Sequence, residues 1–179
     1  MHKFYFLLWF RWATRLTIYS ISLSSLFAFL ITSYTYFSQG TPTINITIFN
    51  ALVEIFKFWF PILWAVTLLL SLFRGLKYIF NNCINGFEMK LLSCSGDDII
   101  QTIGYGDLLK VWRRWFMINI WLVGSFMVFA LVYTKLFTSY SGVFEWFSIY
   151  WLFSFILLSA YLSFILLGAK CKQVKVVQC

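Results

Sequence analysis

Acidic residues and histidine are scarce in this sequence. Of its 179 residues, six are Asp or Glu, one is His, and only 11% are charged. Soluble domains carry about 25% charged residues, so this composition excludes an ordinary soluble domain. The hydrophobic segments contain no chain of Asp, Glu or His, which argues against a proton-coupled transporter. The one histidine, His2, forms no zinc-site spacing with the cysteines.

The motifs of the common enzyme classes are also missing. The sequence contains no HExxH, no GxSxG, no phosphate-binding loop and no dinucleotide fingerprint. A membrane enzyme that acts on lipid would usually place histidine or paired acids at the interface, whereas the sole histidine here is at position 2. We therefore expect no enzyme activity, no cofactor and no metal site.

Long hydrophobic runs dominate what is present, and 61% of the residues are hydrophobic. Hydrocarbon cannot hydrogen-bond to a peptide group, so a run of about 20 apolar residues crosses a bilayer as a helix. We predict an all-α fold, a single membrane domain over residues 1–179 built as a bundle of four transmembrane helices in the lipid bilayer. We expect Met1–Phe10 to lie in the interface as an amphipathic segment. The predicted spans are 16–37, 51–73, 115–137 and 146–169, with a loop over 74–114.

Basic residues indicate how the spans are oriented. Twelve of the 14 Lys and Arg residues lie in the N-terminal tail, the 74–114 loop or the C-terminal tail. Because cytoplasmic loops collect Lys and Arg, both termini and this loop are predicted to be cytoplasmic, in a bacterial inner membrane. Basic residues at span ends are typical of contacts with lipid headgroups, so we expect no nucleic-acid binding. The expected headgroup anchors are Arg11, Arg15, Arg74, Lys77, Arg113, Arg114, Lys170 and Lys172.

Aromatic residues make up 23% of the chain, and many Trp and Tyr residues lie at or near predicted span ends. Trp9, Trp12 and Trp115 are among them, and this pattern is typical of an aromatic belt at the headgroup level. All four cysteines, Cys83, Cys94, Cys171 and Cys179, fall on the predicted cytoplasmic side. Thiols stay reduced there, so the interpretation is four unpaired thiols.

Small and polar residues predict how the spans pack. Small residues let two helices approach closely in lipid, and hydroxyls add hydrogen bonds between helices. Asn119 is expected to bond across helices, and Glu54 is expected to pair with Lys57, three residues later. Pro61 is expected in the early turns of the second span. The stripes expected to point into the bundle, toward each other or a partner, are Ser20, Ser24, Ala28 and Thr32 in the first span and Ser159 and Ser163 in the fourth.

The 74–114 loop contains turn signals at Asn81-Asn82 and Asn85-Gly86, and 87–92 is expected to form a short surface helix. Next comes the string Thr102, Ile103, Gly104, Tyr105, Gly106 and Asp107. This string closely resembles the selectivity filter of potassium channels, in which backbone carbonyls from four such loops bind the ion. The resemblance implies a pore subunit. The alternative is local: the glycines make a turn, and Asp107 caps a helix that runs into the third span.

The layout as a whole is typical of a protein that acts by binding to another protein. A small four-span protein with short outer loops usually acts on another membrane protein. In size and layout this chain looks like bacterial immunity proteins against pore-forming colicins and like the exclusion proteins of conjugative plasmids, a likeness of architecture without a diagnostic motif. It implies recognition of an intruder by intramembrane faces. An accessory subunit of a membrane complex would have nearly the same sequence.

Overall fold

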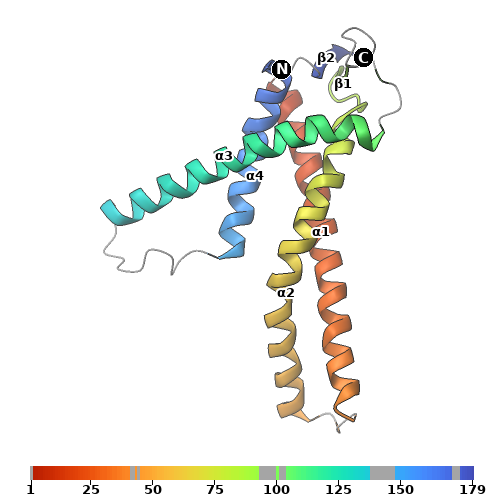
Figure 1. Cartoon of the computed structure of the whole chain (residues 1–179), viewed down its shortest axis with the longest axis vertical. Coiled ribbons are helices and arrows are strands. Elements are labelled where there is room, and N and C mark those ends of the chain that lie inside the picture. Colours follow the sequence, from red (N-terminus) through yellow and green to blue (C-terminus); the bar gives the residue numbers. More distant parts are fainter. Residues whose placement is uncertain are drawn as a thin grey trace. The chain divides into compact units, whose positions relative to one another are not determined.

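The computed structural model is mostly helical and contains four long helices (Figure 1). All four are long and apolar enough to cross a membrane, which confirms the predicted class of multi-pass helical membrane protein. The helices are α1 (His2–Ser38), α2 (Ile46–Gly75), α3 (Tyr105–Phe137) and α4 (Ile149–Lys170). The structure describes residues 2–40, 43, 45–92, 100, 104–137, 148–170 and 174–179.

The helices are longer than the predicted spans at three of their starts. Helix α1 begins at His2 rather than at residue 16, so residues 2–10 are helical and continuous with the first span. The physical reason is that Arg11 and Arg15 are good helix formers, and no Pro or Gly interrupts the chain before Ser38. Helix α2 begins at Ile46, which places Pro61 in the helix interior instead of its early turns.

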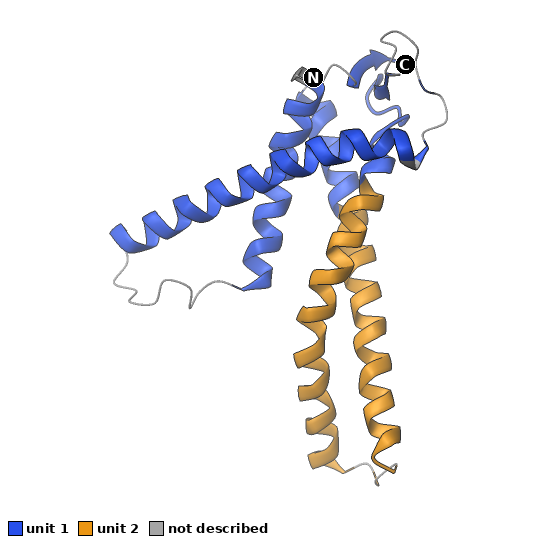
Figure 2. Cartoon of the chain, viewed as in Figure 1, with its two compact units in different colours: residues 1–13, 76–179 blue, residues 14–75 orange. Residues whose placement is uncertain are grey.

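The chain divides into two compact units, coloured in Figure 2. Unit 1 contains residues 1–13 and 76–179, and unit 2 contains residues 14–75. Unit 2 is a pair of helices, the main part of α1 and all of α2, which run side by side. An exposed ion pair lies on α2, where Lys57 Nζ is 2.9 Å from Glu54 Oε1, and this confirms the predicted pairing. Exposed pairs of this kind contribute little stability.

Unit 1 carries a small sheet outside its long helices. After the short 3-10 helix η1 (Leu76–Ile79), strand β1 (Phe87–Leu91) pairs antiparallel with β2 (Val174–Gln178), in a register that joins Phe87 to Gln178 and Leu91 to Val174. The prediction of a short helix over 87–92 was therefore wrong. Its residues alternate apolar and charged, a period of two that suits a strand, and Met89 and Leu91 are buried.

Two cysteines of this sheet region are joined, contrary to the prediction of unpaired thiols. Cys83 and Cys179 form a disulfide, with their Cα atoms 6.1 Å apart. The backbone brings them together, because Cys179 N–H donates to the carbonyl oxygen of Gly86 at 3.1 Å and extends the β1–β2 ladder. The turn before β1 uses left-handed residues, with φ of 57° at Asn81 and 53° at Asn85, as the turn signals predicted. Cys94 and Cys171 lie outside the described residues.

Candidate functional site

In unit 2, the small-residue stripe of α1 faces α2. Ser20, Ser24 and Ala28 are fully buried. The Trp64 Nε1–H donates to Ser20 Oγ at 3.2 Å, and the Thr67 hydroxyl lies 3.2 Å from the Ser20 carbonyl oxygen. Small side chains on α1 let the large indole of Trp64 approach closely, and the Ser20 hydroxyl accepts the hydrogen bond from the indole N–H inside the pair. Thr32 is half-buried, and its hydroxyl donates to the Ala28 carbonyl of its own helix at 2.8 Å.

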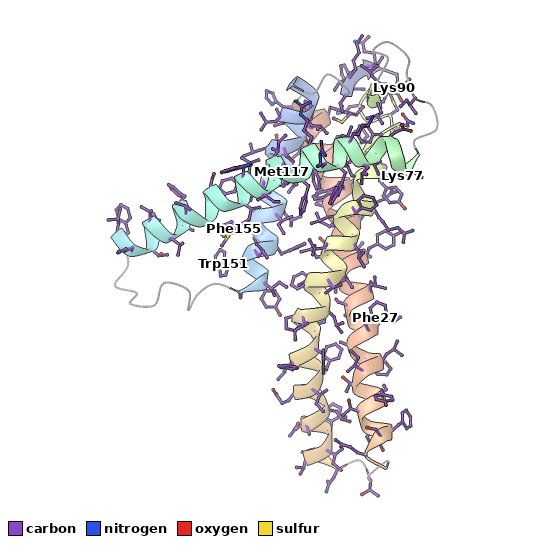
Figure 3. All side chains as sticks on the ribbon, viewed as in Figure 1. Phe27, Lys77, Lys90, Met117, Trp151 and Phe155 are labelled. Atoms are coloured by element: carbon purple, nitrogen blue, oxygen red, sulfur yellow. A yellow bond between two sulfur atoms is a disulfide. The ribbon has the colours of Figure 1, made fainter. Side chains whose placement is uncertain are left out.

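In unit 1, a buried polar contact joins α3 to α4. The Ser159 hydroxyl donates to Asn119 Oδ1 at 2.9 Å, and Asn119 Nδ2 donates to Ser163 Oγ at 3.2 Å and to the Trp115 carbonyl at 3.0 Å. All three side chains are at least nine-tenths buried. This confirms the prediction that Asn119 bonds across helices. Further along the same pair, Phe126 of α3 stacks on Phe155 of α4, with ring centroids 6.4 Å apart. Figure 3 labels Phe155 on α4.

Replacing Asn119 by alanine is expected to lower the free energy of unfolding by about 1 kcal/mol, within the range of hydrogen bonds between membrane helices. The loss stays small because Ser159 and Ser163 keep hydrogen bonds to the carbonyls of Ile156 and Ala160 in their own helix. Denaturant titration of the purified protein in micelles measures it. Ser125→Ala is the control, because that exposed hydroxyl bonds only within α3. Equal losses in both variants would contradict an interhelical role for Asn119.

An aromatic cluster ties the start of α1 to α3 and α4 within unit 1. The rings of Trp12, Trp115 and Phe164 lie 5.2 to 5.9 Å apart. Trp12 is 2% exposed and the other two are fully buried. Two of the residues expected in an aromatic belt are therefore packed inside the protein, because partner rings from three segments surround them. Trp9 also makes a contact inside the protein that an aromatic belt does not predict. Its Nε1–H donates to the Leu157 carbonyl oxygen of α4 at 2.8 Å.

The filter-like string coincides with the start of α3. Gly104 precedes the helix, and its carbonyl accepts a hydrogen bond from the Leu108 N–H at 3.2 Å, which makes Gly104 the N-cap. Tyr105 and Gly106 lie in the first turn. In a helix the carbonyls point along the axis, whereas a filter needs them to converge on an ion. Asp107 is the third helical residue rather than the cap, and its carboxylate lies at the positive helix end. Thr102 and Ile103 lie outside the described residues.

The predicted headgroup anchors that the structure describes are all exposed. They come from both units, and none is enclosed by the aromatic cluster or by the polar contacts. For Lys170 the side chain, and for Lys172 the whole residue, lie outside the described part. The exposed anchors are Arg11, Arg15, Arg74, Lys77, Arg113 and Arg114.

Three contacts within unit 1 were not predicted from the sequence. They are the Cys83–Cys179 bond, the aromatic cluster, and the close approach of Tyr5 to Gly168. Among the described residues, no group of three His, Cys, Asp or Glu side chains could hold a metal ion. Comparison with protein-family models, with curated proteins and with solved structures found no match to this chain.

Proposed function

We propose that this multi-pass membrane protein acts by direct contact with another membrane protein, within the bilayer. One observation carries the proposal: the polar side chains that join the helices, Ser20 to Trp64 and Ser159 to Asn119, are hydrogen-bonded inside each helix pair, while the outward faces carry large apolar side chains. Recognition by these faces is therefore a matter of apolar packing. Lipid also covers apolar helix faces, so a protein partner must be favoured by a further feature of the surface.

That feature is on α3. Its outer face presents Trp121 and Phe129, which are 75% and 71% exposed. Between them lies Gly124, where an added Cβ would meet nothing within 4 Å. A glycine flanked by large side chains forms a notch in which a second helix backbone can approach closely, as small residues do in membrane helix contacts. The α3 outer face consists of Met117, Ile120, Trp121, Gly124, Val128, Phe129 and Val132.

The placement of basic residues completes the proposal. Both tails and the β1–β2 sheet lie on the cytoplasmic side of a bacterial inner membrane, because 12 of the 14 Lys and Arg residues fall there. In this orientation the chain resembles immunity and exclusion proteins in layout, and the α3 outer face would block an incoming toxin or conjugation apparatus in the membrane. An accessory subunit of a resident complex would use the same face.

The test is protection of a host cell. Bacteria that express the chain are challenged with pore-forming colicins and with conjugative donors, and survival and plasmid transfer are counted. We expect protection from one class of intruder, and its loss in the Trp121→Ala/Phe129→Ala variant. Trp151→Ala is the matched control, because Trp151 is an exposed tryptophan that belongs to α4 and not to this face.

Three results would count against the proposal as stated. Protection that survives the double substitution would remove the α3 outer face from recognition. A second result is potassium flux through vesicles containing the purified protein, with the flux abolished by Gly104→Ala. That result would support the hypothesis that the filter-like string forms a pore. Absence of protection together with co-purification of a stable membrane complex would identify an accessory subunit.

A further inference from the structure

The disulfide between Cys83 and Cys179 is unexpected on the side of the membrane that the charge pattern predicts for it. It closes a loop across a sequence separation of 96, which includes all of α3 and α4. Yet this region carries the excess of Lys and Arg that marks the cytoplasmic side, where cellular reductants keep most thiols reduced. A bond on that side persists only under oxidising conditions unless it is inaccessible to small thiols.

The bond joins two surface residues. Both Cys83 and Cys179 are exposed, and exposed disulfides are the ones that exchange readily with small thiols. Re-formation is possible each time β2 returns to β1, because in the paired sheet the hydrogen bond from Cys179 N–H to Gly86 and the adjoining ladder place the two residues close together. A pair that opens easily and closes easily has the properties of a reversible switch.

Apart from the disulfide, β2 is held by its ladder with β1 and by contacts with α4. The ladder with β1 has five residue pairs, and a two-stranded sheet is marginally stable in water on its own. Among the residues of β2, only Val174 is buried, with 4% of its surface exposed. Without the disulfide, β2 would therefore detach from β1 much more often.

Detachment would uncover a binding edge on β1. Met89 turns its backbone carbonyl away from β2, toward the Asn81 N–H at 3.0 Å, so the neighbouring Glu88 and Lys90 direct their backbone groups toward β2. Met89 and Leu91, which are buried and lie opposite Val176 and Val174, would lose their cross-strand neighbours. The edge and its apolar side chains would then be free to pair with another strand.

We propose that the Cys83–Cys179 bond is a redox-controlled clasp that holds β2 on β1 when oxidised and releases it when reduced. The clasp rests on the cytoplasmic placement in the proposed function. Closure consumes a small-molecule disulfide: one protein thiolate attacks it and releases one thiol, and the second protein thiolate attacks the mixed disulfide and releases the other. Two protein thiols and one small disulfide thus give the protein disulfide and two small thiols. Opening is the reverse reaction with two small thiols.

The test counts thiols in living cells. The chain carries Cys94→Ser and Cys171→Ser, so only Cys83 and Cys179 react, and acid-quenched cells are treated with a mass-adding maleimide. We expect two tags in growing cells, no tag after diamide, which converts cellular thiols to disulfides, and two tags again after its removal. Cys83→Ser in the same background, which has one thiol and no clasp, calibrates the tags.

A second measurement tests whether the disulfide holds β2 on β1. Hydrogen exchange of the β2 amides is followed on the purified protein in micelles, oxidised and then reduced. We expect exchange to become faster by about tenfold to a hundredfold on reduction, because the ladder then opens without breaking a covalent bond. The Cys83→Ser variant should match the reduced protein, while exchange in the α3–α4 contact stays unchanged.

Each other outcome has a definite meaning. No tags under any growth condition would overturn both the clasp and the cytoplasmic placement, because a permanent disulfide belongs to an oxidising compartment. Two tags even after diamide would overturn the clasp and leave the placement intact. Tags that respond to diamide without a change in β2 exchange would show that the bond does not control the strand. The protection assay tests the proposed function independently of all three.

Discussion

Replacing Trp115 by alanine is expected to cost unit 1 about 3 to 5 kcal/mol in free energy of unfolding, the largest effect of any single substitution considered. Trp115 is fully buried, and its ring lies 5.8 Å from that of Trp12 and 5.9 Å from that of Phe164. Removal leaves a cavity between three chain segments that cannot close without moving a helix. Denaturant titration in micelles, followed by tryptophan fluorescence and circular dichroism, measures the loss.

Trp121→Ala provides the matched control, since Trp121 is on the same helix and 75% exposed. We expect a change within about 0.5 kcal/mol, as for other substitutions at exposed positions. If both variants lost the same stability, the aromatic cluster would not be what holds the start of α1 against α3 and α4.

Replacing Gly168 by alanine is expected to destabilise unit 1 by about 1 to 3 kcal/mol, the usual cost of overpacking. A Cβ at this position would overlap the hydroxyl oxygen of Tyr5 and lie 3.2 Å from its Cζ atom. Tyr5 is 8% exposed, so its ring has little room to withdraw. The measurement is the same titration in micelles.

The opposite result is expected at Gly124, where an added Cβ meets nothing within 4 Å. There alanine should stabilise the helix by roughly 0.5 to 1 kcal/mol, because glycine loses more chain entropy on folding. Removing the hydroxyl with Tyr5→Phe should restore part of the stability of Gly168→Ala. An additive double variant would show that Tyr5 is not the neighbour that glycine accommodates.

The spans could be predicted from the sequence because the bilayer imposes a local rule. A long apolar run must satisfy its own backbone, and only a helix does so within one segment. Asn119 was predictable for a similar reason, since an amide inside a span needs a partner on a neighbouring helix. Glu54 and Lys57 needed only helical spacing.

The remaining features depend on pairings between distant parts of the chain. Strand β1 has its partner in β2, and Cys83 meets Cys179 across a sequence separation of 96. The burial of Trp12 follows from neighbours on α3 and α4, whereas a tryptophan near a span end is locally indistinguishable from a belt residue. Single-sequence patterns contain no record of which segments meet, so these contacts could not be predicted.

The threading of the chain through the membrane is the claim on which the rest depends, and labelling of single cysteines tests it most directly. In a background without other cysteines, Gln39→Cys, between α1 and α2, and the native Cys83 are each treated in intact cells with a maleimide that cannot cross the membrane. We predict that the cysteine at position 39 is labelled at once, and Cys83 only after the membrane is permeabilised. Labelling of Cys83 in intact cells would contradict the account.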